Sequence, residues 1–255
     1  MELVQILNKL AKFSRAGNWL PKVQISIVFA VIYLFFAQNN YFELLILFIF
    51  YQVCIASYSF ILNSFSEMEI DKLAGKDFGI SDNPKWVNYF VLVLLAGILL
   101  YIPSLFGNVS LFIGWCAFLL ATFYSVKPIK LKEMGFAGVL AASLGAIALP
   151  FLFFVSIIQE NVFLGIYLFF ALFLMELIAE TPHQIEDYEN DKKTKTKTWA
   201  ITAGKKTVRG FTKIVLGTYL IYMPLAFIFG FIQGALIFSV LFLASIQIIV
   251  NAIRL

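Results

Sequence analysis

Two sets of carboxylate and amide side chains in this sequence have the types and spacing that a divalent metal requires. The first set is Asn63, Glu67 and Asp71, and the second contains Asp187 and Asp191. Residues four apart share one face of an α-helix, with about 6 Å of rise between them. Their oxygens suit Mg²⁺, which binds few protein groups and keeps other positions for water and phosphate. The pattern predicts two acidic helix ends that hold Mg²⁺.

The second set continues backwards into an apolar stretch. Glu176, Glu180 and His183 precede Asp187 at spacings of four, three and four residues, so all project from one helical stripe, and a kink at Pro182 would preserve it. Ionisable groups at such depth are expected to face the bundle interior and to be functional. The alternative for Glu176 is a protonated, structural side chain bonded to a neighbouring helix. We interpret the single histidine as a hydrogen-bonding partner rather than a metal ligand.

Acids at a helix end are also common simply because water solvates them, and the first set alone leaves that alternative open. Two such ends beside lysine-rich segments favour a diphosphate site. Metal ions bridge carboxylates to phosphate oxygens, and lysines neutralise the remaining charge. The same arrangement stabilises diphosphate as a leaving group and so releases an allylic cation. The 29 Phe and 11 Tyr permit a long hydrocarbon guest, although such residues commonly face lipid or pack helices.

The elements that must position these groups are membrane-spanning helices. Of the 255 residues, 61% are hydrophobic and only 13% are charged, which is rare in soluble domains. Apolar runs of about 20 residues match the bilayer core. We predict a single-domain (1–255), all-α, polytopic membrane bundle with eight spans, at residues 23–42, 44–64, 86–106, 109–126, 135–157, 162–182, 210–231 and 234–253.

The basic residues predict the orientation of these spans. All 19 Lys and Arg lie in or beside the two ends of the chain and the connections after the second, fourth and sixth spans. This places both termini and the acidic helix ends in the cytoplasm, most simply at the cell (inner) membrane. The net charge of +4 describes one membrane face, and no motif suggests nucleic-acid binding. Residues 1–22 have no signal-peptide core, and their apolar spacing predicts an interfacial helix.

Four segments carry a resemblance to a known family. They are Asn63-Ser64-x-x-Glu67-x-x-x-Asp71, Asp187-x-Glu189-x-Asp191 with Lys195 and Thr198, Tyr124-Ser125-x-x-Pro128-x-Lys130-Leu131-Lys132, and Arg15-x-x-x-Trp19. In type and order they resemble the motifs of the UbiA superfamily of intramembrane prenyltransferases. The resemblance implies a helical bundle, usually of nine spans, whose central cavity opens to the lipid and is capped by cytoplasmic loops.

The resemblance also implies the roles of individual residues. Mg²⁺ would be held by Asn63, Glu67, Asp71, Asp187 and Asp191. The diphosphate would be bound by Arg15, Tyr124, Lys130, Lys132 and Asn63, with Asp71, Asp187 and Tyr124 as catalytic residues. The implied reaction is ionisation of a prenyl diphosphate, followed by transfer of the prenyl group to a lipophilic acceptor in the membrane lipid.

Three positions depart from the family pattern. Ser64 and Glu67 stand where Asp is usual, and Lys195 stands where Gly is usual. The segment after Asp71 lacks the Arg-Pro pair common in aromatic prenyltransferases, which disfavours a benzoate-type acceptor. The leading hypothesis is therefore a transferase in quinone, carotenoid or related lipid synthesis.

Two other functions remain open from the sequence. A UbiA-type terpene cyclase would need the same metal site. A transporter or non-catalytic membrane protein could use Glu176, Glu180 and His183 as a proton relay. Against a transporter, the spans lack paired Gly/Pro-broken helices, and the acids gather at one face rather than at the midplane.

Overall fold

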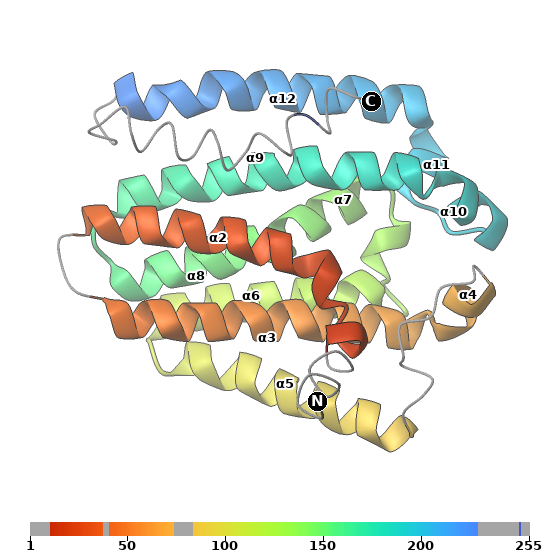
Figure 1. Cartoon of the computed structure of the whole chain (residues 1–255), viewed down its shortest axis with the longest axis horizontal. Helices are drawn as coiled ribbons and strands as arrows, with labels where there is room; N and C mark the ends of the chain where they lie inside the picture. Colours follow the sequence, from red (N-terminus) through yellow and green to blue (C-terminus); the bar gives the residue numbers. More distant parts are fainter. Residues whose placement is uncertain (1–10, 38–40, 74–83, 229–249, 251–255) are drawn as a thin grey trace, which may run out of the picture.

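The computed structural model describes residues 11–37, 41–73, 84–228 and 250. Long helices lie side by side and alternate in direction (Figure 1). They are α2 (Ala16–Phe36), α3 (Phe42–Ser66), α5 (Lys85–Ser104), α6 (Asn108–Ser125), α9 (Val162–Glu186) and α12 (Lys205–Ile228). Between α6 and α9 the chain forms α7 (Phe136–Ser143), the π-helical η2 (Leu144–Ala148) and α8 (Leu149–Ile158). Short helices make the connections: α4 (Met68–Leu73), η1 (Leu131–Glu133), α10 (Tyr188–Thr194) and α11 (Trp199–Ala203).

The described part of the chain contains six helical segments long and apolar enough to cross a membrane. They match the first six predicted spans, with shifted ends. α12 covers most of the seventh, but its first nine residues include four basic side chains. The predicted eighth span, 234–253, lies outside the described residues except for position 250. The all-α class is confirmed, and the number of spans remains a prediction.

The first span begins earlier than its hydropathy indicates. Residues 16–22, which we expected in a separate interfacial helix, form the first two turns of α2. Trp19 is buried against the α3 surface around Ala56, and its indole Nε1 donates to the Ser14 carbonyl oxygen at 2.8 Å. Packing against α3 therefore draws this polar stretch into the bundle. Residues 1–10 lie outside the described part.

The fifth span is not one uniform α-helix. Its middle is the π-helical η2, which ends just before Pro150 at the start of α8. A π-helical turn widens the helix and redirects backbone carbonyls. One of them, on Ala146, accepts a hydrogen bond from Gln52 Nε2 at 3.1 Å. A buried polar side chain of α3 thus satisfies the irregular backbone, as an apolar environment demands.

Two hydrophobic clusters hold the bundle together. One joins α2, α3, α8, α9 and α12 around Phe29, Phe154 and Leu168, and the other joins α3, α5 and α6 around Tyr51 and Leu99. α3 belongs to both clusters. α9 is buried along most of its length, whereas α5 exposes large apolar side chains such as Val93. The two helices that end in acidic residues are therefore central to the packing.

Candidate active site

Both acidic sets lie at the same end of the bundle. α3 and α9 both run towards that end, where α4, α10 and α11 gather (right-hand side of Figure 1). α2 begins there, so Arg15 is also at this end. The topology confirms that segments more than 100 residues apart in sequence come together.

The first set lies across a helix break. α3 ends at Ser66, and Glu67 separates it from α4. The amide of Glu67 still donates to the Asn63 carbonyl at 3.0 Å, and that of Asp71 to the Glu67 carbonyl at 2.8 Å. The four-residue spacing therefore survives the break. Ser125 Oγ donates to Asn63 Oδ1 at 3.0 Å, which orients the amide from α6.

The second set has the same construction. Asp187 separates α9 from α10, and its amide donates to the His183 carbonyl at 2.9 Å. The amide of Asp191 donates to the Asp187 carbonyl at 2.9 Å. Thr198 Oγ1 donates to Asp191 Oδ2, also at 2.9 Å, and so fixes that carboxylate.

The backbone conformation of Lys195 shows why the family pattern has a glycine at this position. Its φ of 58° lies in the left-handed region that favours glycine, at the C-terminus of α10. The turn brings Thr196 back so that its amide donates to the Asp191 carbonyl at 2.9 Å. The chain therefore keeps the turn of the motif with a lysine.

Arg15 lies within the electrostatic influence of both acidic sets. Its Nη1 donates to Ser64 Oγ at 3.1 Å, and its guanidinium lies 5.3 Å from the ring centre of Phe60. Burial lowers the pKa of Arg15, while the charges of Asp71, Glu67 and Asp187 act in the opposite direction. An arginine stays protonated despite such a shift. One cation thus acts on carboxylates from both sets.

Glu67 is enclosed by lysines. Lys130 Nζ lies 3.3 Å from its Oε1, and Lys132 Nζ donates to its Oε2. Lys130 also donates to Glu133. Burial opposes protonation of Lys130, but the bond to Glu133 and the charge of Glu67 outweigh it and raise the pKa. The sequence assigned Glu67 to a metal and both lysines to a diphosphate, and the structure pairs them with one another.

The segment that carries these lysines packs tightly. A Cβ at Gly138 would lie 2.6 Å from the Leu131 carbonyl oxygen, so only glycine allows α7 to approach η1 this closely. Gly135 forms an isolated parallel bridge with Thr198. The rings of Phe136 and Trp199 lie 5.0 Å apart beside this bridge. The lysine segment and the second acidic set are therefore one connected unit.

The deeper acids of α9 face α2. Lys22 Nζ donates to Glu176 Oε2 at 2.9 Å and lies 3.9 Å from Glu180 Oε2. From the sequence, Lys22 indicated only the orientation of the spans, and this contact was not predicted. The usable signal was that Lys22 is the only charged residue of α2. His183 is exposed, and its Nδ1 lies 3.4 Å from Glu186 Oε2.

Tyr124 belongs to the same end of the bundle as the acidic sets. It is near the end of α6, within the electrostatic influence of Glu180, Glu67, Asp191 and Asp187. The neighbouring residue, Ser125, contacts Asn63. The predicted site residues, which lie in or directly beside α2, α3, α4, α6, η1 and α10, thus come together at one end.

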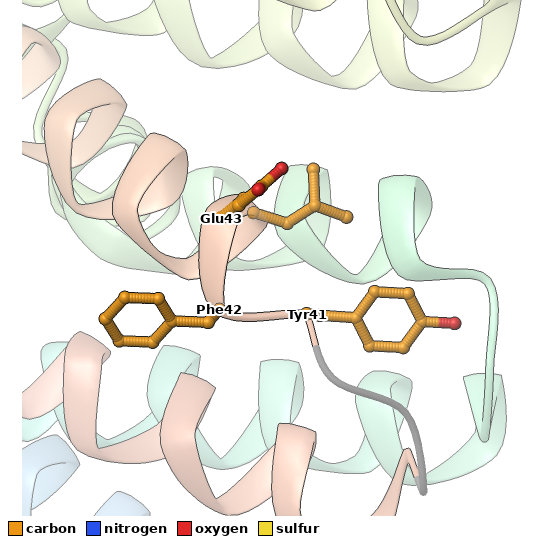
Figure 2. Close-up of a pocket in the computed structure, with 4 residues that line it drawn as sticks. Tyr41, Phe42 and Glu43 are labelled. Atoms are coloured by element: carbon orange, nitrogen blue, oxygen red, sulfur yellow. The ribbon is translucent and has the colours of Figure 1, made fainter.

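A separate hollow lies at the opposite end of the bundle, where α3 begins. It is lined by Tyr41, Phe42, Glu43 and Leu44, and Figure 2 shows Tyr41 and Phe42 pointing to opposite sides. Tyr41 Oη donates to Glu160 Oε1 at 2.5 Å, which ties this turn to the start of α9. None of the predicted site residues lies here, so we assign this hollow to the helix connection.

The donor set suits a metal that takes few protein ligands. Within the described ranges, no three Asp, Glu, His or Cys side chains are close enough to hold a metal by themselves. Mg²⁺ commonly uses one or two carboxylates and completes its shell with water and substrate phosphates. Each acidic set offers two carboxylates, Glu67 with Asp71 in the first and Asp187 with Asp191 in the second, which is within that number.

Known proteins resemble this chain in sequence and in fold. The profile of the UbiA prenyltransferase family matches residues 25–255. A digeranylgeranylglyceryl phosphate synthase of Pyrococcus horikoshii is 28% identical over 202 residues, which covers 74% of this chain and 69% of that protein.

Two solved structures show the same fold. A UbiA homologue of Archaeoglobus fulgidus bound to GPP and Mg²⁺ has a TM-score of 0.76 at 17% identity, covering 96% of this chain and 86% of that one. A digeranylgeranylglyceryl phosphate synthase has a TM-score of 0.64 at 18% identity, covering 98% and 99%. At this identity the likeness concerns the fold alone.

Proposed function

Because the chain belongs to the UbiA prenyltransferase family, we propose that its acidic helix ends bind a prenyl diphosphate with Mg²⁺ and transfer the prenyl group to a lipophilic acceptor. The chain is an intramembrane prenyltransferase and an integral membrane protein. The observation that carries the assignment of the site is the position of Arg15. It donates to Ser64 beside the first acidic set and is influenced by carboxylates of both sets.

Four residues have the chemistry to hold Mg²⁺ in this site. Asn63 and Asp71 offer oxygens from the first set, and Asp187 and Asp191 offer them from the second. Neighbours already orient two of these groups, since Ser125 donates to Asn63 and Thr198 donates to Asp191. Bound Mg²⁺ supplies positive charge that makes diphosphate a better leaving group.

The protein's own cations supply the rest of the diphosphate site. Arg15, Lys130 and Lys132 approach the acids from α2 and η1. We expect the two lysines to exchange part of their contact with Glu67 for contacts with diphosphate oxygens. The Glu67 carboxylate could then accept a hydrogen bond from a ligand of the metal. We expect the Tyr124 hydroxyl to donate to the diphosphate, with Asp71 and Asp187 as the other catalytic residues.

The acceptor class is suggested by the Pyrococcus relative. Its name indicates an acceptor built on glyceryl phosphate. We propose an acceptor of this kind, a prenylated glycerol with an anionic group, in preference to a quinone or carotenoid precursor. From the basic connections we expect the site to face the cytoplasm at the cell membrane, and we propose that residues 1–255 form one domain.

Diphosphate release tests the proposed function directly. We expect purified protein in detergent to release diphosphate from geranylgeranyl or farnesyl diphosphate only with Mg²⁺ and acceptor present. Mass analysis of the lipid products then identifies the reaction. A cyclic hydrocarbon formed from the donor alone would identify a terpene cyclase. No release with any donor and lipid extract would instead support a binding or transport role.

Thr198→Val is expected to raise the Mg²⁺ concentration needed for half-maximal turnover about tenfold, since groups that orient metal ligands have effects of this size. The change removes the hydroxyl that donates to Asp191 and keeps the side-chain volume. Turnover measured across a Mg²⁺ series tests it. Thr207→Val is the matched control, because Thr207 is exposed on α12. Equal half-saturation in both variants would contradict the role of Thr198.

A further inference from the structure

We propose that the buried ion pair of Lys22 with Glu176 is a positioning element that sets the place of Arg15 relative to the second acidic set. The proposal rests on the proposed function, because it gives the pair a role in binding the diphosphate. Neither residue belongs to the family motifs described above. Both act through Arg15 rather than on the reacting atoms.

The pair lies inside the membrane-spanning part of the bundle. The side chain of Glu176 is 3% exposed and that of Lys22 is 20% exposed. Their atoms Nζ and Oε2 are 2.9 Å apart, while Glu180 is a looser neighbour at 3.9 Å. This is a direct, charge-assisted bond between α2 and α9.

Stability alone is a poor explanation for such a pair. Removing two charges from water has a large cost, and well-packed apolar residues of similar volume often stabilise a protein as well or better. The best-attested role of a buried pair is to fix the register of the elements it joins. A pair kept at this depth therefore indicates that the relative placement of α2 and α9 matters.

The spacing along α2 and α9 shows which site residues the ion pair would position. Lys22 lies seven residues after Arg15, which directly precedes α2, and seven residues of helix span about 10 Å. Glu176 precedes Asp187 by eleven residues on α9, or about 16 Å. The helices run in opposite directions, so the pair locks the segment that leads to Arg15 against the segment that leads to Asp187 (Figure 1).

Two further features of α2 explain why the ion pair would be needed to hold its first turns in place. Towards its other end, Tyr33 Oη donates to the Glu160 carbonyl oxygen in the connection before α9, so that end of α2 is already fixed. Near Arg15, Pro21 lies inside the helix and removes one backbone hydrogen bond. The first turns are therefore weakly held by their own backbone, and Lys22 follows directly after this weak point.

The test is a set of variants analysed by steady-state kinetics. Glu176→Gln keeps the shape and removes the charge, and Glu186→Gln is the control from the exposed end of the same helix. We expect Glu176→Gln to raise the KM for the prenyl diphosphate about tenfold with kcat changed less than about threefold, because a misplaced Arg15 weakens donor binding. The double exchange Lys22→Glu with Glu176→Lys should recover most of the lost affinity.

A double-mutant cycle shows whether the pair acts through Arg15. In an Arg15→Ala background, Glu176→Gln should have almost no further effect on the donor KM. Independent effects of the two changes, or an unchanged KM with reduced kcat, would overturn the proposal. Lys22→Arg checks folding, since it keeps the charge and should keep the KM. Wild-type protein without Mg²⁺-dependent release would refute the proposed function itself, a separate result from an additive cycle.

Discussion

Asp187→Asn is expected to lower diphosphate release about a hundredfold to a thousandfold at saturating Mg²⁺, the range seen when a group that stabilises transition-state charge is removed. Asp187 lies at the junction of α9 and α10, within the influence of Arg15 from α2. Its backbone bonds with His183 and Asp191, both 2.9 Å, remain in the variant. Asparagine has nearly the same shape, so the fold should be kept while the charge is lost.

The control for this prediction is Glu186→Gln, the adjacent residue. Glu186 is exposed and lies beside His183, so the variant removes one negative charge from the same helix end without entering the site. Turnover, membrane insertion and thermal unfolding are measured for both proteins. Failure of Asp187→Asn to insert would show that the carboxylate is structural. Equal loss of turnover in both variants would mean that net charge, rather than this site, is responsible.

Glu67→Gln is expected to reduce both stability and turnover. It leaves Lys130 and Lys132 without their shared carboxylate, and these side chains are only 11% and 14% exposed. Breaking a largely buried ion pair by removing one partner costs about 3 kcal/mol. The loss should shrink when prenyl diphosphate and Mg²⁺ are added, because the diphosphate then neutralises the lysines. Thermal unfolding with and without donor measures both effects.

Glu67→Asp separates the length of the side chain from its charge. Aspartate is one methylene shorter and cannot keep both lysine contacts, so we expect turnover about tenfold lower, between wild type and Glu67→Gln. Glu69→Gln is the matched control, since Glu69 is exposed two residues away. Turnover equal to wild type in Glu67→Asp would show that the departure from the family motif is neutral. If adding the prenyl diphosphate leaves the thermal stability of Glu67→Gln unchanged, the two lysines do not move their contacts to the diphosphate.

Within single segments, the sequence predicted most of the helices, although not the early start of α2 or the π-helical η2. Hydropathy predicted six of the long helices because an apolar run of bilayer length has few alternatives to a helix. The four-residue spacing of Asn63, Glu67 and Asp71 predicted a common face, and backbone bonds across the break after Ser66 preserve it. The family motifs then supplied the candidate residues, each of which the structure places at one end of the bundle.

Only the tertiary structure decided how these segments meet. The contact of Lys22 with Glu176, the enclosure of Glu67 by Lys130 and Lys132, and the Gln52 bond to η2 all join different helices. Hydropathy and periodicity describe which face of a helix is apolar, and both are properties of that helix alone. Which polar group finds which partner depends on the rotation and register of two helices, which are set by packing across the whole bundle. The sequence by itself therefore determined the chemistry available to this protein, and the packing determined its pairings.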